Sequence, residues 1–185
     1  MIKDFVKILQ FVAVLSMFFA ITACSDGNDF MQKANNMSKK QQQETLDSLN
    51  RCLVNQEKEA INDYIKKSGN TYAETGTGLR YRIVNQGDGE LLQTGNVAVM
   101  DYESRLLDGD LLYSSTEDGN KMIVVGHGGV ESGLEEALLH LHYGDEAEII
   151  IPMRLAHGLI GDGKRIPPCA TIVYKIKVIE NQLNK

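Results

Sequence analysis

The side chains that could take part in acid–base, nucleophilic or metal chemistry occur in patterns that do not support such chemistry. His127 is flanked by glycines that could form an oxyanion loop, but the sequence contains no Gly-x-Ser-x-Gly motif to supply a nucleophile. His140 and His142 are two residues apart, so in a helix they point to different faces and fit exposed positions at a helix end better than a metal site. We therefore expect no catalytic acid, base or nucleophile, no bound metal and no cofactor.

The overall composition is that of an acidic globular protein. The chain has 185 residues, with 19 basic and 25 acidic side chains and a formal net charge of −6. No nucleic-acid partner is expected, because neutralising phosphates needs clustered Lys and Arg. Hydrophobic residues make up 43% and charged residues 24% of the chain, which excludes wholesale disorder and fits one domain with an appendage.

Residues 1–23 have the pattern of an export signal. Lys3 and Lys7 precede an apolar run that ends at Ala23 and is shorter than the ~20 residues that a membrane-spanning helix needs. Cys24 follows directly, and this junction resembles the signal of bacterial lipoproteins, in which the cysteine is diacylated. We expect a lipoprotein signal peptide over residues 1–23 and lipidation at Cys24, with ordinary secretion and a free Cys24 as the alternative.

Lipidation at Cys24 predicts where the protein resides. Acyl chains on this cysteine would anchor the protein to a membrane of the bacterial cell envelope. Ser25 stands where an aspartate would favour retention at the inner membrane, so the expected location is the outer membrane, facing the periplasm. The polar segment 24–36 is expected to be a flexible tether.

Residues 37–75 are expected to form a helical stalk. Residues 38–67 contain no Gly and no Pro, their apolar side chains recur at helical spacing, and Gly69 is placed to end the helix. We expect the apolar stripe of this helix to pack against its own domain, because Glu57 interrupts the stripe and sustained heptads are absent. The alternative is that the stripe forms the seam of a weak homodimer.

Residues 76–185 have the pattern of a sheet-rich domain. Alternating apolar and polar residues predict strands over residues 79–84, 96–107, 110–114, 121–125, 147–151 and 171–179. A tight hairpin turn is expected at Asp108-Gly109. One helix is expected, beginning with a capping box of Ser132 and Glu135 and ending at Gly144. The predicted class is α+β, an antiparallel sheet of about five strands wrapped on one short helix and preceded by the helical stalk.

Short motifs throughout this domain resemble the FK506-binding-protein (FKBP) class of peptidyl-prolyl cis-trans isomerases. The matching motifs are Gly87-Asp88-Gly89, Val99-Met100-Asp101-Tyr102, Asp108-Gly109, Ser114-Ser115, Val125-Gly126, Val130-Glu131-Ser132-Gly133-Leu134-Glu135-Glu136, Ile151-Pro152, Leu155-Ala156-His157-Gly158 and Ile166-Pro167-Pro168-x-Ala170-Thr171. They occur in the family's order at near-family spacing, and this order is more specific than any single motif. The lipoprotein signal, the stalk and the motif Glu74-Thr75-Gly76-x-Gly78-Leu79-x-Tyr81 are similar to those of exported family members. Some of these are gliding-motility-associated lipoproteins, which the motif Leu155-Ala156-His157-Gly158-Leu159-Ile160-Gly161-Asp162-Gly163 also resembles.

The resemblance implies an isomerase that needs no acid, base, metal or cofactor. Rotation about an Xaa-Pro bond meets a barrier of ~18–20 kcal/mol, because resonance gives the bond double-bond character. An apolar cup favours the twisted, less dipolar amide, and hydrogen bonds can hold the substrate in that pose. The implied substrates are Xaa-Pro segments of exported proteins, whose folding slow proline isomerisation limits. The alternative is a non-catalytic chaperone or scaffold module that binds Pro-containing segments of an envelope partner.

The resemblance also implies which residues form the substrate pocket. The pocket positions of the family map onto Tyr102, Leu112, Tyr113, Val130, Glu131, Leu134, His157, Ile166 and Tyr174. The backbone of Glu131 is expected to bind the peptide. Leu134 replaces a tryptophan of the best-known members, Tyr113 replaces an aspartate, and His157 replaces a tyrosine. Leu112 stands where the family has an aromatic wall, and a further aromatic position falls on Lys121, so these replacements alter the pocket rather than the fold.

Overall fold

The computed structural model describes residues 38–180, and the predicted signal peptide, the lipidated Cys24 and the tether lie outside these residues. The chain divides into two compact units, Met1–Leu53 and Val54–Lys185, and the second unit contains the whole sheet. No helix within residues 38–180 is long and apolar enough to cross a membrane.

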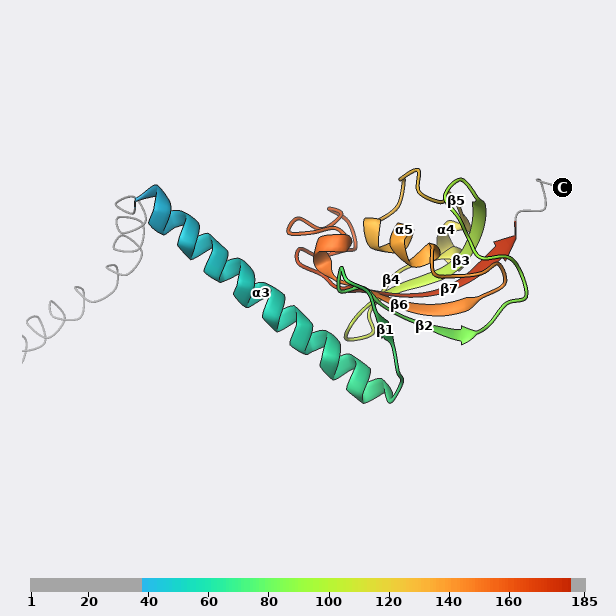
Figure 1. Ribbon diagram of the computed structural model, residues 1–185, viewed down its shortest axis with the longest axis horizontal. Helices are drawn as coiled ribbons and strands as arrows, with labels where there is room; N and C mark the ends of the chain where they lie inside the picture. The colour runs from blue at the N-terminus through green and yellow to red at the C-terminus, as the bar shows by residue number, and fades with distance from the viewer. Residues whose placement is uncertain (1–37, 181–185) are drawn as a thin grey trace, which may run out of the picture. The chain divides into compact units, whose positions relative to one another are not determined.

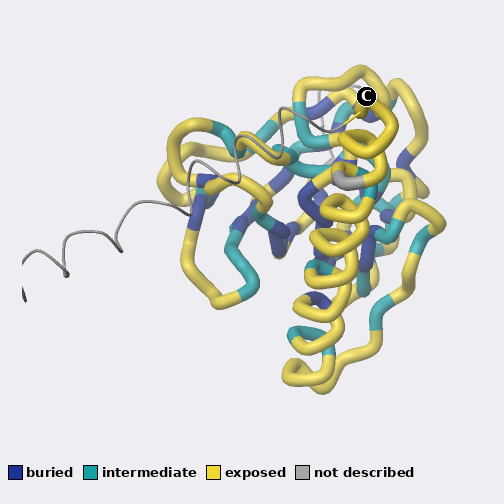
Figure 2. The backbone as a smooth tube through the Cα atoms, turned by 90° about the vertical axis from the view of Figure 1, so that its left-hand side faces the viewer, coloured by how far each residue is buried: buried dark blue, intermediate teal, exposed yellow. Residues whose placement is uncertain are grey.

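One long helix, α3 (Lys39–Ser68), precedes the sheet, as the composition of this stretch predicts. Ser38 and Gln41 cap its start, because the backbone N–H of each donates to a side-chain oxygen of the other, over 3.0 and 3.3 Å. Gly69 ends the helix in the left-handed region at φ 67°, where glycine is favoured, and donates its N–H to the carbonyl of Lys66. Most residues of this helix are exposed (Figure 2).

The sheet is antiparallel, with the strand order β1-β2-β6-β7-β3-β4 and with β5 paired to β3 (Figure 1). The strands are β1 (Ala73–Glu74), β2 (Arg80–Asn85), β3 (Val97–Leu106), β4 (Leu111–Ser114), β5 (Lys121–Val124), β6 (Glu146–Ile151) and β7 (Ile172–Glu180). The alternating pattern predicted all of these strands except β1. This strand lies at the end of the range 37–75, which was expected to be the helical stalk, and it pairs with β2. A one-turn helix that was not predicted, α4 (Ser115–Asp118), follows β4.

The short helix α5 (Ser132–Leu138) covers one face of the sheet (Figure 1). Its apolar residues belong to the main core. The helix lies so close to β6 that a Cβ atom on Gly133 would come within 2.3 Å of the Ile151 side chain. This position therefore needs glycine for its size rather than for its backbone freedom. The predicted class, an α+β domain with an antiparallel sheet on one helix, is confirmed.

The predicted ends of α5 are wrong. Glu131, not Ser132, is the N-cap residue, and the hydroxyl of Ser132 instead donates to the carbonyl of Leu155. Glu135 does not close a capping box, because its Oε2 accepts a 2.6 Å hydrogen bond from the backbone N–H of Gly126. The helix ends at Leu138 rather than Gly144, since the following residues turn to form the bridge Leu91↔His142.

The C-terminal part of α3 covers the other face of the sheet. Successive residues of a strand point to opposite faces, so Ile149 faces the main core while Ile150 packs with Ile61 of α3. The hydroxyl of Tyr64 donates a 2.8 Å hydrogen bond to Glu148 of β6. This part of the apolar stripe therefore packs against its own domain, as the sequence predicts.

Candidate functional site

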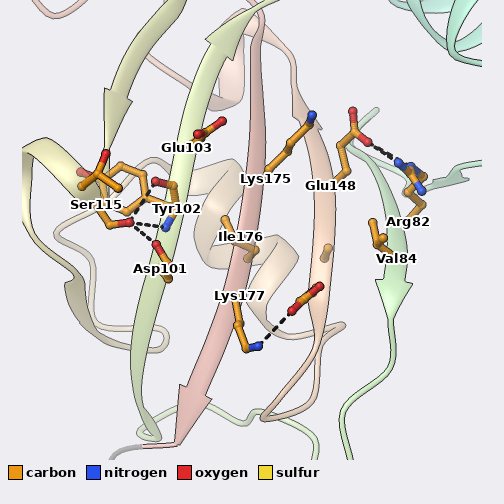
Figure 3. Close-up of a pocket in the computed structure, with 13 residues that line it drawn as sticks. Arg82, Val84, Asp101, Tyr102, Glu103, Ser115, Glu148, Lys175, Ile176 and Lys177 are labelled. Atoms are coloured by element: carbon orange, nitrogen blue, oxygen red, sulfur yellow. Dashed lines mark hydrogen bonds and ion pairs between the residues drawn. The ribbon is translucent and has the colours of Figure 1, made fainter.

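Two cavities border the residues that the resemblance assigns to the pocket. The larger, of about 470 Å³, lies over the outward-facing side chains of β2, β6, β7 and β3 (Figure 3). The smaller, of about 360 Å³, lies beside the start of α5 and is bordered by β3, β4, β7 and the loop between β6 and β7.

The larger cavity is floored by charges that alternate in sign from strand to strand. In the register of the sheet, Lys177 of β7 lies between Asp101 of β3 and Glu146 of β6. The ammonium of Lys177 forms an ion pair of 2.9 Å with Glu146. Opposite charges on neighbouring strands stabilise a sheet, so these side chains have a structural role.

The smaller cavity brings together most of the predicted pocket residues. It is lined by Tyr102, Tyr113, Glu131, His157, Ile166 and Tyr174. Leu112 and Leu134 are buried in the main core and Val130 packs against that core, so these three residues support the cavity without lining it. Three lining residues were not predicted, Asp118, Asp162 and Lys164, and Lys121 also lines the cavity, as its match to an aromatic position of the family implies. We take this cavity, hereafter the pocket, as the candidate site.

A hydrogen-bonded cluster of Glu131, His157 and Tyr174 forms the inner wall of the pocket. The side chain of Glu131 is only 7% exposed. Its Oε1 accepts a 2.8 Å hydrogen bond from the hydroxyl of Tyr174 and lies 3.0 Å from Nε2 of His157. Its Oε2 is buried and accepts no hydrogen bond. The resemblance assigned a role to the Glu131 backbone, whereas its side chain is here a central group of the pocket.

The charge state of this cluster follows from its contacts. Burial opposes ionisation of Glu131, but hydrogen bonds from its own backbone N–H and from Tyr174, together with the nearby Lys121, lower the pKa of its carboxyl below the ordinary value. Burial and the same carboxylate raise the pKa of the Tyr174 hydroxyl. At neutral pH the pocket wall therefore holds a fixed carboxylate beside a neutral tyrosine.

A second hydrogen-bonded group, around Asp162, shapes the rim. The hydroxyl of Tyr113 donates to Asp162 Oδ2, and the backbone N–H groups of Lys164 and Ile166 each donate over 2.8 Å to Oδ1. Burial acts in the other direction, but these hydrogen bonds lower the pKa of Asp162 to about 2. An aspartate that accepts from N–H groups two and four residues ahead organises a turn, and this turn places Ile166 at the pocket.

The ammonium of Lys121 lies over the ring of Tyr102, 4.9 Å from its centroid. The rings of Tyr102 and Tyr174 are tilted with centroids 6.2 Å apart, so they form one aromatic corner of the pocket. Lys121, onto which the resemblance maps a further aromatic position, contributes a cation that contacts this corner. The pocket can hold a small apolar ring against the tyrosines while charged groups surround it.

Two of the other histidines, His140 and His142, make structural contacts. His140 stacks on Tyr81 with ring centroids 4.9 Å apart, and Nδ1 of His142 lies 3.5 Å from the buried carboxylate of Asp145. Across the part of the chain that the structure describes, no three His, Cys, Asp or Glu side chains converge to hold a metal ion.

Comparison with known proteins identifies the class to which this sheet and pocket belong. Residues 89–179 match the family described as FKBP-type peptidyl-prolyl cis-trans isomerase, so the chain contains a domain of this family. The FKBP-type 22 kDa peptidyl-prolyl cis-trans isomerase of Escherichia coli is 32% identical over 120 residues, which are 65% of this chain and 57% of that protein. The Outer membrane protein MIP of Legionella longbeachae is 31% identical over 103 residues, 56% of this chain and 44% of that protein. The chain thus spans about half the length of these curated relatives.

Solved structures show the same fold. The crystal structure of FkpA from Escherichia coli has a TM-score of 0.60 at 23% identity, and the match covers 94% of this chain and 81% of that chain. A peptidyl-prolyl cis-trans isomerase from Pseudomonas syringae pv. tomato has a TM-score of 0.59 at 24% identity, covering 70% of this chain and 92% of that chain.

Proposed function

We propose that the protein is a peptidyl-prolyl cis-trans isomerase that assists the folding of exported proteins. The observation that carries this proposal is the pocket itself, in which Tyr102, Tyr174 and Ile166 meet in a domain of the FKBP-type family. The pyrrolidine ring of a substrate proline would pack against the two tyrosine rings.

Catalysis in such a pocket requires binding and orientation, without a covalent step. Twisting the Xaa-Pro bond weakens its resonance, so a site that holds the peptide part-way along this rotation lowers the barrier. The two ring walls would fix the proline while the preceding carbonyl turns. Lys121, at the pocket, can donate a hydrogen bond to that carbonyl, whereas the Nε2–H of His157 is directed at the Glu131 carboxylate.

For the location we propose the bacterial cell envelope, with a lipid on Cys24 as the anchor and the domain facing the periplasm from the outer membrane. The apolar segment before Cys24 supports an export signal. One relative is named as an outer membrane protein, which agrees with this location. The substrates would then be Xaa-Pro segments of proteins that fold after export.

A second function is favoured by the charges in the pocket. The Glu131 carboxylate is held ionised and Lys121 covers the face of Tyr102, whereas a twisted amide is favoured by apolar surroundings. The alternative is therefore a non-catalytic module that binds Pro-containing segments of an envelope partner as a chaperone or scaffold.

The test is cis-to-trans isomerisation of an Xaa-Pro tetrapeptide by the full chain in a mild detergent. Tyr113→Ala removes a half-buried pocket tyrosine, and Tyr81→Ala makes the same change at a half-buried position outside the pocket. We expect catalysis above background, a loss of about tenfold in kcat/KM in the first variant, and little change in the second. If the native chain is folded and the isomerisation rate stays at background, the proposed isomerase activity is contradicted. Saturable binding of the same peptide would then support the non-catalytic binding module.

A further inference from the structure

The outer wall of the pocket comes from one long loop. Residues 152–171 connect β6 to β7 and contain four pocket residues, His157, Asp162, Lys164 and Ile166. The loop leaves and rejoins the sheet at the same place, since Ile151 and Ile172 are paired in the ladder. The position of these two loop ends therefore determines where these side chains lie.

A single carboxylate oxygen contacts both ends of this loop. Oε1 of Glu57, on α3, accepts a hydrogen bond of 2.6 Å from the backbone N–H of Met153 and another of 2.6 Å from the hydroxyl of Thr171. Met153 begins the short 3₁₀ helix Met153–Leu155, where the first N–H groups have no partner within the turn. Hydrogen bonds to an ionised carboxylate are about twice as strong as those between neutral groups, so Glu57 suits this position.

Glu57 is itself held in place by the residues that follow it on α3. Ile61, one turn further on, is buried against β6 and β7. Tyr64, almost one turn after Ile61, donates to Glu148, and the same carboxylate forms an ion pair of 2.6 Å with Arg82. These contacts fix this part of the helix against the sheet, so Glu57 presents its carboxylate to the loop from a rigid support.

The pocket side of the loop is attached to the start of α5. The hydroxyl of Ser132 donates to the carbonyl of Leu155, and His157 contacts the carboxylate of Glu131. The first part of the loop is thus held from two directions, by Glu57 and by Glu131 and Ser132 at the start of α5. Loss of either support would allow His157 to move away from Glu131.

We propose that Glu57 is a positioning residue of the substrate pocket, which holds both ends of the loop 152–171 and thereby the side chains of His157, Asp162 and Ile166. Glu57 does not line the pocket, so it acts through the loop and not on the substrate. The inference rests on the proposed isomerase function insofar as the positioned groups are those that contact the peptide.

The test compares Glu57→Ala with Glu59→Ala, which removes an exposed carboxylate from the same helix. Both variants of the full chain are assayed for isomerisation and for amide hydrogen exchange. In Glu57→Ala we expect kcat/KM to fall about tenfold relative to the native chain. Amide exchange over residues 153–170 should become about tenfold faster than in the native chain, while exchange in the strands stays the same. Glu59→Ala should change neither quantity. Glu57→Gln keeps an acceptor and should recover part of both losses.

Three results would overturn the proposal. One is unchanged kcat/KM and unchanged loop exchange in folded Glu57→Ala, and another is exchange that accelerates equally in loop and strands, as expected for a merely structural residue. If Glu57→Ala does not fold, Glu57→Gln decides, and its failure to alter loop exchange counts against the role. If the native chain does not isomerise peptides, the exchange pattern still tests the loop contact separately from the enzyme.

Discussion

The hydroxyl of Tyr174, on β7, donates a 2.8 Å hydrogen bond to Oε1 of Glu131, the residue that precedes α5. This contact joins the sheet to the helix across the inner wall of the pocket. Because both groups are buried, the bond matters for the stability of the domain as well as for the charge that a substrate meets.

Replacing Tyr174 by phenylalanine should destabilise the domain. The change removes the donor and leaves a buried carboxylate with one hydrogen bond fewer, which costs about 1 to 3 kcal/mol of the free energy of unfolding. Urea unfolding measures the loss. The matched control is Tyr81→Phe, at a tyrosine that stacks on His140, and it should stay within about 0.5 kcal/mol of the native chain. Equal losses in both variants would argue against a role for this bond.

The stability of the domain should fall in acid partly because of Glu131. Its pKa in the folded state lies below the ordinary 4.5, because its own backbone N–H, Tyr174 and Lys121 outweigh the opposing effect of burial. A lowered folded pKa means that the ionised form stabilises the fold above the unfolded pKa, and that this contribution is lost as the pH falls through the folded value. Between neutral pH and a pH of about 3, the free energy of unfolding should therefore fall less in Glu131→Gln than in the native chain. A Glu131→Gln profile parallel to that of the native chain would refute this assignment.

The ion pair between Arg82 and Glu148 should be costly to break from one side only. The two side chains are 24% and 5% exposed, so Arg82→Met leaves a largely buried carboxylate without its cation. We expect a loss of about 3 kcal/mol in the single variant and a smaller loss when Glu148→Met is added. A double-mutant cycle by chemical unfolding measures this coupling. Losses that simply add would show that the pair has no coupled contribution.

Gly133→Ala should lower stability although it improves helix propensity. The added methyl group would lie 2.3 Å from the Ile151 side chain, so α5 must move away from β6 at a cost of about 1 to 3 kcal/mol. Gly76→Ala is the control, because nothing lies within 4 Å of its Cβ position. Thermal unfolding should show a lower midpoint for the first variant and an unchanged or slightly raised midpoint for the second. Unchanged stability in Gly133→Ala would mean that the close contact relaxes freely.

The strands and the long helix could be predicted because their signals are local. Alternation of apolar and polar residues places β3 and β7, and the absence of Gly and Pro places α3. The ends of α5 could not be predicted from the same kind of pattern. Ser132 and Glu135 have the spacing of a capping box, but their partners lie 23 and 9 residues away in other segments.

Much of the pocket could be predicted only through the ordered family motifs. Tyr102 and Tyr174 lie on strands and are buried, so the alternating pattern alone assigns them to the core. The role of Asp162 could have been suspected from its place in a glycine-rich turn, where an aspartate often accepts backbone hydrogen bonds. Glu57 gave no such signal, since its two partners are 96 and 114 residues away along the chain.

The shortness of α5 has a consequence for how the protein folds. The helix has seven residues, and the two side chains best suited to cap it bond to Leu155 and Gly126 instead. Isolated helices shorter than ~12 residues are marginal in water, so α5 has little tendency to form before those segments are in place. We therefore expect α5 to form late in folding, after the long-range strand pairs. Because Glu131 at the start of α5 lines the pocket, a chain without this helix would have an incomplete pocket. Isomerase activity should then return only with the last step of refolding.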